Sequence, residues 1–379
     1  MRIALITPGF SANEYDWCIP VLRNLARDLA QSHEISVYAL TYPSFAKDYE
    51  VAGVPVTSFG DGRTGLVAQI RRLTRAYRRL RADHNQRPFA VLHGFWADQG
   101  GLLAAVAGQR LDIPSVVSVM AGELIDEPTI GYGKRRHPVS GRLATYGARH
   151  AKVITVSSPY HRARLAAEQP AITASVVVLG VDQNLFQPKG PVTPLLGDPS
   201  LLMVGSLVPL KGHIVALRAL RRVRERLPDA HLHLAGSGAG EKTLREAVSE
   251  LGLTEAVTFH GHVPHGDLPG FYRGSELCLL ASYFENHGMV VLEAAACGRV
   301  TVGTAVGLLP DLVPADLLCN PGDEAGMATA LQGLLTAEKR RKQLEQALVT
   351  SIDECYSLAH TTQDFKSIYG RLAVPQPAR

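Results

Sequence analysis

The sequence predicts an α/β protein of two domains, each built around a parallel β-sheet. Short apolar runs, typical of buried parallel strands, alternate with stretches of helical periodicity. The alternation stops at residues 187–194, where three prolines and a glycine fall close together. The 379 residues suffice for two ordinary domains. We expect an N-terminal domain at residues 1–188, a C-terminal domain at 189–355 and a last segment at 356–379.

The N-terminal domain is expected to begin with a strand at residues 3–7. The apolar run ends at Pro8 and Gly9, so it is too short for the core of a signal peptide. The pattern then predicts strands at residues 35–40, 90–93, 115–120 and 153–156, with helices at 22–31 and 64–83.

The C-terminal domain is expected to repeat this alternation. Its predicted strands are residues 201–204, 231–235, 257–260, 277–280 and 300–304, with a helix at 213–227. The last segment carries Phe365, Ile368, Tyr369 and Leu372 at helical spacing. Because it follows the last strand, we expect it to be a helix that packs back on the N-terminal domain.

Composition excludes several classes of protein. Lysine and arginine number 39 against 35 acids, and this mild balance gives no indication of nucleic-acid binding. The five cysteines are scattered without a Cys-x-x-Cys spacing, as in reduced cytosolic proteins. No run approaches the roughly 18 apolar residues of a membrane span. We expect a cytoplasmic protein.

Residues 285–298, ENHGMVVLEAAACG, carry the strongest functional signal. They follow the apolar run at 277–280, so Glu285 is expected at the carboxyl end of a parallel strand, where open α/β sheets bind ligands. A helix with a second acid, Glu293, comes next. One element thus offers two carboxylates for sugar hydroxyls and a helix N-terminus for a phosphate.

Two further loops follow predicted strands of the same domain. Residues 205–212, GSLVPLKG, bring Lys211 to a position between a strand end and a helix start, where it can place its charge on phosphate oxygens. Residues 236–240, GSGAG, open another helix. Such a glycine run is equally typical of a ligand loop and of a tight turn.

These segments, in this order, resemble the family 4 glycosyltransferases, a retaining group that transfers sugars from nucleotide-sugar donors. The motifs are LGVDQNLFQP at 179–188, VGSLVPLKG at 204–212, HLAGSG at 233–238, FHGHVPHGDLPGFYRGSELCLLAS at 259–282, the E-x7-E pair Glu285 and Glu293, and AAACGRVTVGTAVGLLPDLV at 294–313. The resemblance covers the C-terminal domain almost throughout.

The resemblance implies a GT-B fold, two Rossmann-like domains facing a cleft, with the donor held mainly by the second. By this likeness Glu285 bonds donor-sugar hydroxyls and supports charge at the anomeric carbon, Glu293 accepts from ribose hydroxyls, and Lys211 neutralises the leaving pyrophosphate. The donor site is completed by Gly9, Ser206, Gly236, His287 and the backbone amides of Gly288, Met289 and Val290. The donor is expected to be a UDP- or GDP-sugar, with no required cofactor or metal.

The sequence departs from the family pattern at three places. Ser206 stands where the family usually has an arginine on the pyrophosphate; Arg273 and Arg299 are candidate substitutes, although we expect both to face solvent. Gly9 is followed by Phe10 where the family has paired glycines.

The third departure lies after the strand at 115–120. Met120 and Ala121 replace a histidine-glycine pair that touches the donor sugar in the family. Either Glu123 takes over that contact or the region is shaped for another sugar. We place Glu123 and the turn at His93 on the acceptor side.

Two other groups of residues invite interpretation. His231, His233 and His260 lie on neighbouring predicted strands, but no carboxylate or cysteine stands at ligand spacing, so we predict no metal site. The helix at 64–83 combines an apolar stripe, Leu66, Ile70, Leu73, Tyr77 and Leu80, with arginines 71, 72, 75, 78, 79 and 81. A solvated basic face is the simpler interpretation, and peripheral contact with an anionic inner membrane face is the functional one.

The sequence therefore predicts a retaining glycosyltransferase that moves a hexosyl group from a nucleotide sugar to a hydroxyl acceptor on a glycan, a lipid-linked molecule or a small molecule. One alternative is a nucleotide-sugar-binding protein that has lost catalysis, which Ser206 and Met120 motivate. Another is a related GT-B enzyme such as a sugar-nucleotide epimerase, which would need no acceptor.

Overall fold

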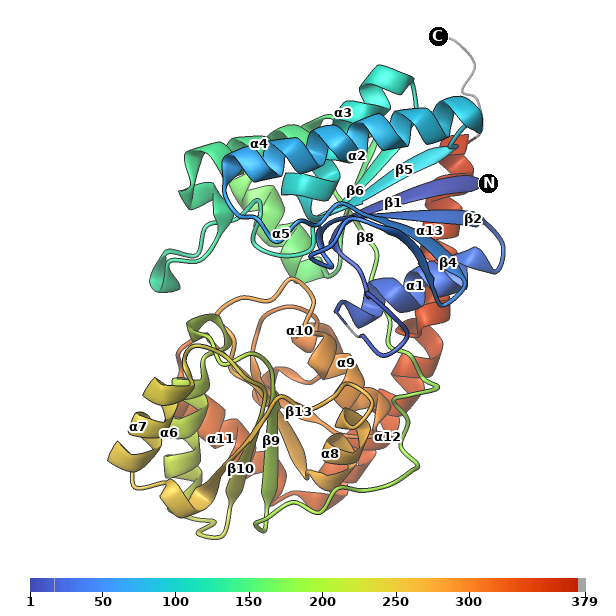
Figure 1. The fold of residues 1–379 in the computed structure, drawn as a ribbon. Helices are drawn as coiled ribbons and strands as arrows, with labels where there is room; N and C mark the ends of the chain where they lie inside the picture. The colour runs from blue at the N-terminus through green and yellow to red at the C-terminus, as the bar shows by residue number, and fades with distance from the viewer. Residues whose placement is uncertain (17, 374–379) are drawn as a thin grey trace. The chain divides into compact units, whose positions relative to one another are not determined.

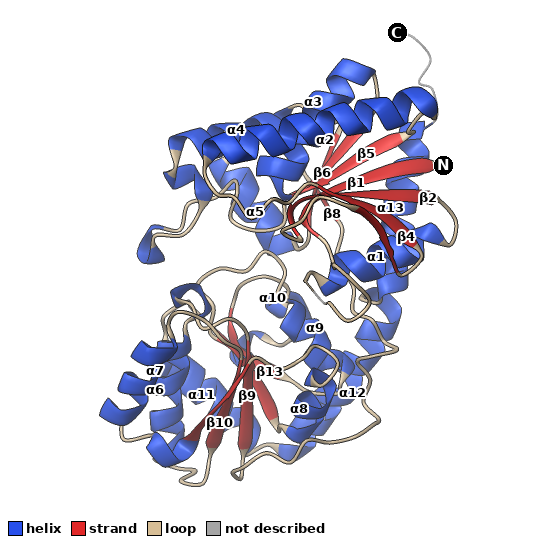
Figure 2. Cartoon of the chain, in the orientation of Figure 1, coloured by secondary structure: helices blue, strands red, loops and turns tan. Residues whose placement is uncertain are grey.

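The computed structural model describes residues 1–16 and 18–373 and divides the chain into two compact units. Unit 1 contains Met1–Leu179 and the terminal segment from Leu358, and unit 2 contains Gly180–Ser357. The chain thus passes between units near the domain limits expected from the sequence, residues 188 and 355. The α/β architecture with parallel sheets is confirmed in both units, where helices flank the strands (Figure 2).

Unit 1 has an eight-stranded sheet in the order β3-β4-β2-β1-β5-β6-β7-β8. Its strands are β1 (Arg2–Gly9), β2 (Glu34–Tyr42), β3 (Asp48–Val51), β4 (Val54–Ser58), β5 (Val91–Phe95), β6 (Ser115–Ser118), β7 (Val153–Val156) and β8 (Ser175–Val176). All pairings are parallel except that of β3 with β4. In register, Ala4 of β1 pairs with Ser36 on one side and Leu92 on the other.

The helices of unit 1 cover both faces of this sheet (Figure 1). They are α1 (Pro20–Ala30), α2 (Leu66–Gln86), α3 (Gly101–Leu111), α4 (Pro138–Arg149), α5 (Pro159–Glu168) and α13 (Leu358–Ala373), with a π-helical turn at Trp96–Gly100. Helices α2 and α3 enclose one apolar core with the strands, while α1 and α13 pack together on the other face. Phe365, Ile368 and Tyr369 of α13 are buried, as parallel-sheet packing on both faces requires.

Unit 2 has a six-stranded parallel sheet in the order β11-β10-β9-β12-β13-β14. Its strands are β9 (Ser200–Val204), β10 (His231–Ala235), β11 (Val257–Gly261), β12 (Leu277–Leu280), β13 (Thr301–Thr304) and β14 (Leu318–Cys319). Its helices are α6 (His213–Arg224), α7 (Glu241–Glu250), α8 (Leu268–Gly274), α9 (Met289–Ala296), α10 (Leu309–Leu312), α11 (Glu324–Leu335) and α12 (Glu338–Cys355). Helices α6, α7 and α11 lie on one side, and α8, α9 and α12 on the other (Figure 1).

Helix α2 differs from its sequence-based description at two points. Leu66 and Ile70, expected on the buried stripe, are 55% and 54% exposed, whereas Leu80 is buried. Arg72, expected on the basic outer face, is buried and bonds Asp61 at 2.9 Å. The buried residues of the helix are Ala68, Arg72, Ala76 and Leu80, and Leu73 and Tyr77 pack partly buried against the same core. Arg72 is tolerated between two alanines because its charge is paired.

Candidate active site

In unit 2, the structure brings the two predicted catalytic residues into direct contact. Strands β9 and β12 are neighbours, and the loops after their carboxyl ends carry Lys211 and Glu285. Lys211 Nζ lies 2.6 Å from Glu285 Oε1, and the Ser282 hydroxyl donates to the same oxygen at 2.7 Å. The Lys211 and Glu285 side chains are 25% and 11% exposed, so the pair is sheltered yet open to a ligand.

The backbone explains why Lys211 reaches this position. Gly212 has a φ of 68°, and a Cβ there would lie 2.0 Å from the carbonyl oxygen of Ala281. Only a glycine allows the loop after β9 to press against the end of β12 in this way. Ala281 directly precedes Ser282, so this close approach sets the lysine beside the glutamate.

A helix N-terminus opens beside the same pair. Helix α9 begins at Met289, after Gly288 has turned the chain with a φ of 85°. The first amides of a helix have no partner within it, and here they belong to Met289 and Val290. His287, predicted for the donor site, is buried in this turn, and its carbonyl accepts from the Leu308 amide at 2.9 Å.

Glu293, the second acid, lies inside unit 2 on α9. It is 5% exposed, and its Oε2 accepts the Tyr272 hydroxyl at 2.7 Å while Oε1 lies 3.4 Å from His265 Nε2. Phe186 packs against both partners. Each carboxylate oxygen keeps a second lone pair, so contact with a ribose stays a prediction.

The glycine-rich turn after β10 is occupied by the protein itself. A Cβ on Gly236 would lie 1.9 Å from the carbonyl oxygen of Gly205, and the Gly236 amide donates to Gly261 O at 2.8 Å. This glycine is therefore explained by packing between two loops, and its contact with a donor stays a prediction. Ser206 follows Gly205 in the loop after β9 and is exposed.

The expectation that Arg273 and Arg299 face solvent is wrong. Arg273 is 8% exposed and donates to Pro191 O at 2.9 Å and Gln187 O at 3.0 Å, which fixes the proline-rich segment. Arg299 donates to the Arg273 carbonyl at 2.6 Å. Because both guanidinium groups are engaged in this way, neither residue replaces the missing arginine at Ser206.

His213, the residue after Gly212, was not singled out from the sequence. It begins α6 and is 3% exposed, and neither ring nitrogen has a hydrogen-bond partner among the described residues. Burial, and then the charge of Lys211, lowers the pKa of His213 to about 4. The imidazole is thus neutral beside the lysine, a feature that a histidine in a helix pattern does not reveal.

In unit 1, His93 does not lie on an accessible surface. Its Nδ1 lies 2.6 Å from the Tyr369 hydroxyl and its Nε2 2.7 Å from the Ser118 hydroxyl, and the ring is fully buried against Phe95 and Phe365. Burial lowers the pKa of His93 to about 3. This placement contradicts an acceptor contact, because the side chain of this mid-strand residue points toward α13.

Glu123 is also buried, but at the carboxyl edge of the unit 1 sheet. It accepts hydrogen bonds from the amides of Ala97 at 3.2 Å, Met120 at 3.1 Å and Ala121 at 2.6 Å. Burial raises the pKa of its carboxyl above the usual value, while the amides of Met120 and Ala121 oppose the shift. Gly9 lies at the same edge, where β1 ends, and its Cβ position is closed off by Cys18 and Tyr42 at 3.3 Å.

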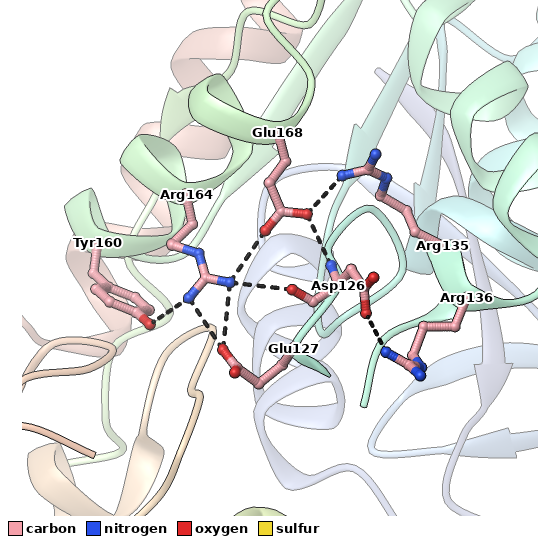
Figure 3. A network of polar contacts seen from close by, with 7 residues as sticks. All are labelled: Asp126, Glu127, Arg135, Arg136, Tyr160, Arg164 and Glu168. Carbon is pink, nitrogen blue, oxygen red and sulfur yellow. Dashed lines mark hydrogen bonds and ion pairs between the residues drawn. The ribbon is translucent and has the colours of Figure 1, made fainter. Parts of the chain in front are cut away.

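A polar network holds the loop that follows Glu123 (Figure 3). Arg164 of α5 lies 3.1 Å from Glu168 and 3.3 Å from Glu127, and Glu168 in turn accepts from Arg135 at 2.7 Å and from the Asp126 amide at 2.8 Å. Figure 3 shows these side chains converging from α5 and from the loop. The network ties the loop to a rigid helix.

Two negative findings bear on metals and membranes. Within residues 1–16 and 18–373, no cluster of three or more histidine, cysteine, aspartate or glutamate side chains is arranged to hold a metal ion. His231 instead bonds Thr258 at 2.8 Å, and His233 bonds His260 at 2.9 Å. None of the helices in this described part combines the length and apolar character that crossing a bilayer would require.

Comparison with known proteins finds two family models that together span most of the chain. The model of "Glycosyl transferases group 1" matches residues 191–348, and that of "Glycosyl transferase 4-like domain" matches residues 19–182. A protein named D-inositol 3-phosphate glycosyltransferase from Stackebrandtia nassauensis is 30% identical over 324 residues, which cover 77% of this chain and 70% of that protein. A glycogen synthase from Mycobacterium tuberculosis is 27% identical over 316 residues, 79% of this chain and 74% of its own.

Solved structures share the fold. Sucrose-phosphate synthase from Thermosynechococcus elongatus matches with a TM-score of 0.81 at 20% identity, covering 98% of both chains. Alr3699/HepE of Anabaena, solved with UDP and glucose, matches with a TM-score of 0.75 at 16% identity, covering 98% of this chain and all of its own.

Proposed function

Since the chain belongs to the group 1 glycosyl transferases, GT-B enzymes that move sugars from nucleotide-sugar donors, we propose that Glu285 and Lys211 carry a hexosyl transfer with retention at the anomeric carbon. The observation that carries this proposal is the 2.6 Å contact between Lys211 and Glu285 at the carboxyl edge of the unit 2 sheet. The donor is a UDP- or GDP-sugar, and the acceptor supplies a hydroxyl.

The pair fits the charges that such a reaction creates. Cleavage of a sugar–phosphate bond leaves positive charge on the sugar and negative charge on the departing nucleotide, and fixed groups of opposite sign lower that barrier. Glu285 would face the sugar. Lys211 and the first amides of α9 would face the pyrophosphate, and these amides supply part of the positive potential that Ser206 lacks.

Ligand-induced thermal stabilisation tests donor binding. The protein is heated with UDP, GDP, ADP and their glucose and mannose conjugates. We expect the nucleotides of one base to raise the melting temperature, since a ligand of the folded state shifts unfolding by mass action. No shift with any member of the panel would count against an intact donor site. The nucleotide sugar whose melting-temperature shift most exceeds that of its free nucleotide is then used as donor in the transfer assay.

Glu285→Gln tests the catalytic assignment. It removes the carboxylate charge while keeping a similar shape, so transfer should fall by about 10²-fold or more while nucleotide still raises the melting temperature. Glu246→Gln, an exposed acid on α7, is the matched control. Full activity of Glu285→Gln would refute the assignment, and intact nucleotide binding without transfer in the unmodified protein would favour the binding-protein alternative.

We also propose that unit 1 contacts anionic membrane through the start of α2. Leu66, Val67 and Ile70 are 54–62% exposed there, and exposed arginines at 63, 71, 75, 78 and 81 accompany them. Aliphatic side chains beside arginines are suited to the headgroup region of anionic lipid.

Vesicle sedimentation tests this contact. Binding to phosphatidylcholine vesicles should appear when phosphatidylglycerol is added and should weaken in Leu66→Ser/Ile70→Ser. Val192→Ser, which removes an exposed apolar side chain of unit 2, is the control. Equal binding of all variants, or none at low salt, would reject the proposal.

A further inference from the structure

We propose that Trp96 is the platform on which a six-membered polyhydroxylated ring, a pyranose or a cyclitol, stacks in a pocket at the carboxyl edge of the unit 1 sheet, and that Glu123 positions this platform. The inference rests on the proposed transfer function and names the chemical class of its acceptor. It concerns unit 1 alone.

The pocket has a volume of about 350 Å³, within the range of small-ligand sites. It is formed by the segments that follow β5 and β6, two neighbouring parallel strands. Its lining consists of an aromatic pair, Trp96 and Tyr132, a short glycine-rich stretch, and the polar side chains of Glu123, Lys134 and His137. Ligands of open α/β sheets bind at this edge.

Trp96 is held in a backbone conformation that bulky residues avoid. Its φ is 61°, and the two other described non-glycine residues with positive φ, Ala52 and Asp112, lie in a hairpin turn and at a helix C-cap. Left-handed backbone at a tryptophan persists only where its surroundings enforce it, and such sites gather at ligand pockets. Trp96 is nevertheless partly exposed, so its ring is not simply a core residue.

Glu123 holds the backbone at Trp96 in this conformation. Its Oε1 accepts from the amide of Ala97, the residue directly after Trp96, and from the amide of Met120. Its Oε2 accepts from Ala121 at 2.6 Å. One buried carboxylate thus joins the turn after β5 to the turn after β6. Glu123 is a positioning residue, because its oxygens are used by backbone amides rather than presented to a ligand.

The opposite wall of the pocket is also fixed. Glu127 and Tyr132 form an antiparallel bridge, and the Tyr132 hydroxyl accepts from the Gly122 amide at 3.1 Å. Lys134 also bonds Asp98, so the segment after β6 and the turn after β5 are cross-linked again. The network of Figure 3 anchors the base of this loop to α5. The pocket is therefore formed before any ligand arrives.

The chemistry of the walls selects the ligand. A pyranose or cyclitol presents an apolar C–H face that covers an aromatic ring, and a rim of hydroxyls that needs hydrogen-bond partners. Trp96 offers the first kind of surface, and Lys134 and His137 offer the second. Lys134 and His137 also suit a ring that carries a phosphate.

Tryptophan fluorescence tests the platform directly, because the chain has only two tryptophans, Trp17 and Trp96. Trp17→Phe leaves Trp96 as the only tryptophan in the full chain. This variant, saturated with the nucleotide that stabilises it, is titrated with maltotriose, mannobiose, myo-inositol 1-phosphate and, as an acyclic control, glycerol 3-phosphate. We expect a saturable change in Trp96 emission with at least one ring compound and none with glycerol 3-phosphate.

The choice of compounds distinguishes a saccharide acceptor from a phosphorylated cyclitol. A response to maltotriose or mannobiose assigns a saccharide acceptor, and a response to myo-inositol 1-phosphate alone assigns a phosphorylated cyclitol. If no ring compound alters the emission, or if glycerol 3-phosphate alters it equally, the proposal is overturned. Nucleotide stabilisation is measured on the same sample, so loss of the donor site would be seen separately.

Glu123→Gln tests the positioning role. It replaces one acceptor oxygen with an NH2 group, which cannot accept, so either the bond from Ala121 or the bonds from Ala97 and Met120 are lost. Trp96 emission should therefore shift before any ligand is added, and the midpoint of the ring titration should rise about tenfold, as the loss of one hydrogen bond to a charged group predicts. Trp17→Phe with Tyr146→Ala, which removes an exposed aromatic of α4 outside this pocket, should match the parent. A Glu123→Gln protein with unchanged emission and midpoint would reject the role.

Discussion

At the scale of single residues, the Lys211–Glu285 contact sets one positive and one negative charge side by side. The two groups are suited to opposite parts of a bond that breaks into charged halves, the lysine to the negative part and the glutamate to the positive part. The contact therefore makes each residue's activity dependent on the other.

Lys211→Met should lower kcat by about 10²–10³-fold, the loss typical of removing one preorganised group from a developing charge. Lys211→Arg should recover part of the loss, because the charge returns but its planar fork differs from a compact ammonium. Steady-state kinetics on the transfer reaction measure both. Lys242→Met, an exposed lysine on α7, controls for the loss of a surface charge. Equal kcat in all of them would contradict a role for Lys211.

The sequence could identify the functional residue types but not their partners. Glu285 and Lys211 follow strand patterns, so their position at a sheet edge was predictable. Ser282, which donates to Glu285, and Tyr272, which donates to Glu293, are ordinary residues in sequence and acquire a role only through tertiary contacts. His93 was misplaced because its partner, Tyr369, comes from the other end of the chain.

At the scale of elements, β10 and β11 carry three histidines in contact. His233 Nδ1 lies 2.9 Å from His260 Nε2, and the ring of His231 lies beside that of His233. Burial, and then neighbouring charge, lowers the pKa of His231 to about 4, and burial also lowers the pKa values of His233 and His260. The folded state thus favours three neutral rings.

These three neutral histidines predict that unit 2 loses stability in acid. A base with a depressed folded pKa contributes stability that is present above its unfolded value, about 6.5, and is lost as the pH falls toward 4. Between pH 7 and pH 5 the free energy of unfolding should drop by about 1 kcal/mol through His231. Urea unfolding at both values measures it, and His231→Gln should flatten the slope. An unchanged slope in His231→Gln would contradict this account.

Elements with strong periodicity were predictable, and short or edge elements were not. Strands β9, β10 and β12 match apolar runs because both faces of each are covered. The β3–β4 hairpin and the two-residue strands β8 and β14 are set by pairing with a neighbour, which leaves little local signal. For α2, the pattern predicted the helix and the buried Leu80, but not the exposure of Leu66 and Ile70 or the burial of Arg72.

At the scale of the whole molecule, unit 1 is completed by α13 from the end of the chain. Tyr369 is fully buried and its hydroxyl satisfies His93. Tyr369→Phe should lower the free energy of unfolding of unit 1 by about 1–3 kcal/mol, because a buried ring nitrogen loses its partner. Hydrogen exchange of β5 amides would report the loss. Tyr146→Phe, an exposed tyrosine, should have little effect, and similar protection in both variants would contradict the prediction.

Because unit 1 is built from two separate stretches of the chain, it also determines which unit is completed first during synthesis. Domains usually fold in the order in which they leave the ribosome. Here all of Gly180–Ser357 emerges before Leu358, so the second unit in the sequence is the first whose chain is complete. Unit 1 is complete only when the helix Leu358–Ala373 has been made, so a nascent chain interrupted before Leu358 would carry a complete unit 2 and an incomplete unit 1. A gene segment encoding residues 180–357 could, by the same logic, be exchanged between relatives as one block.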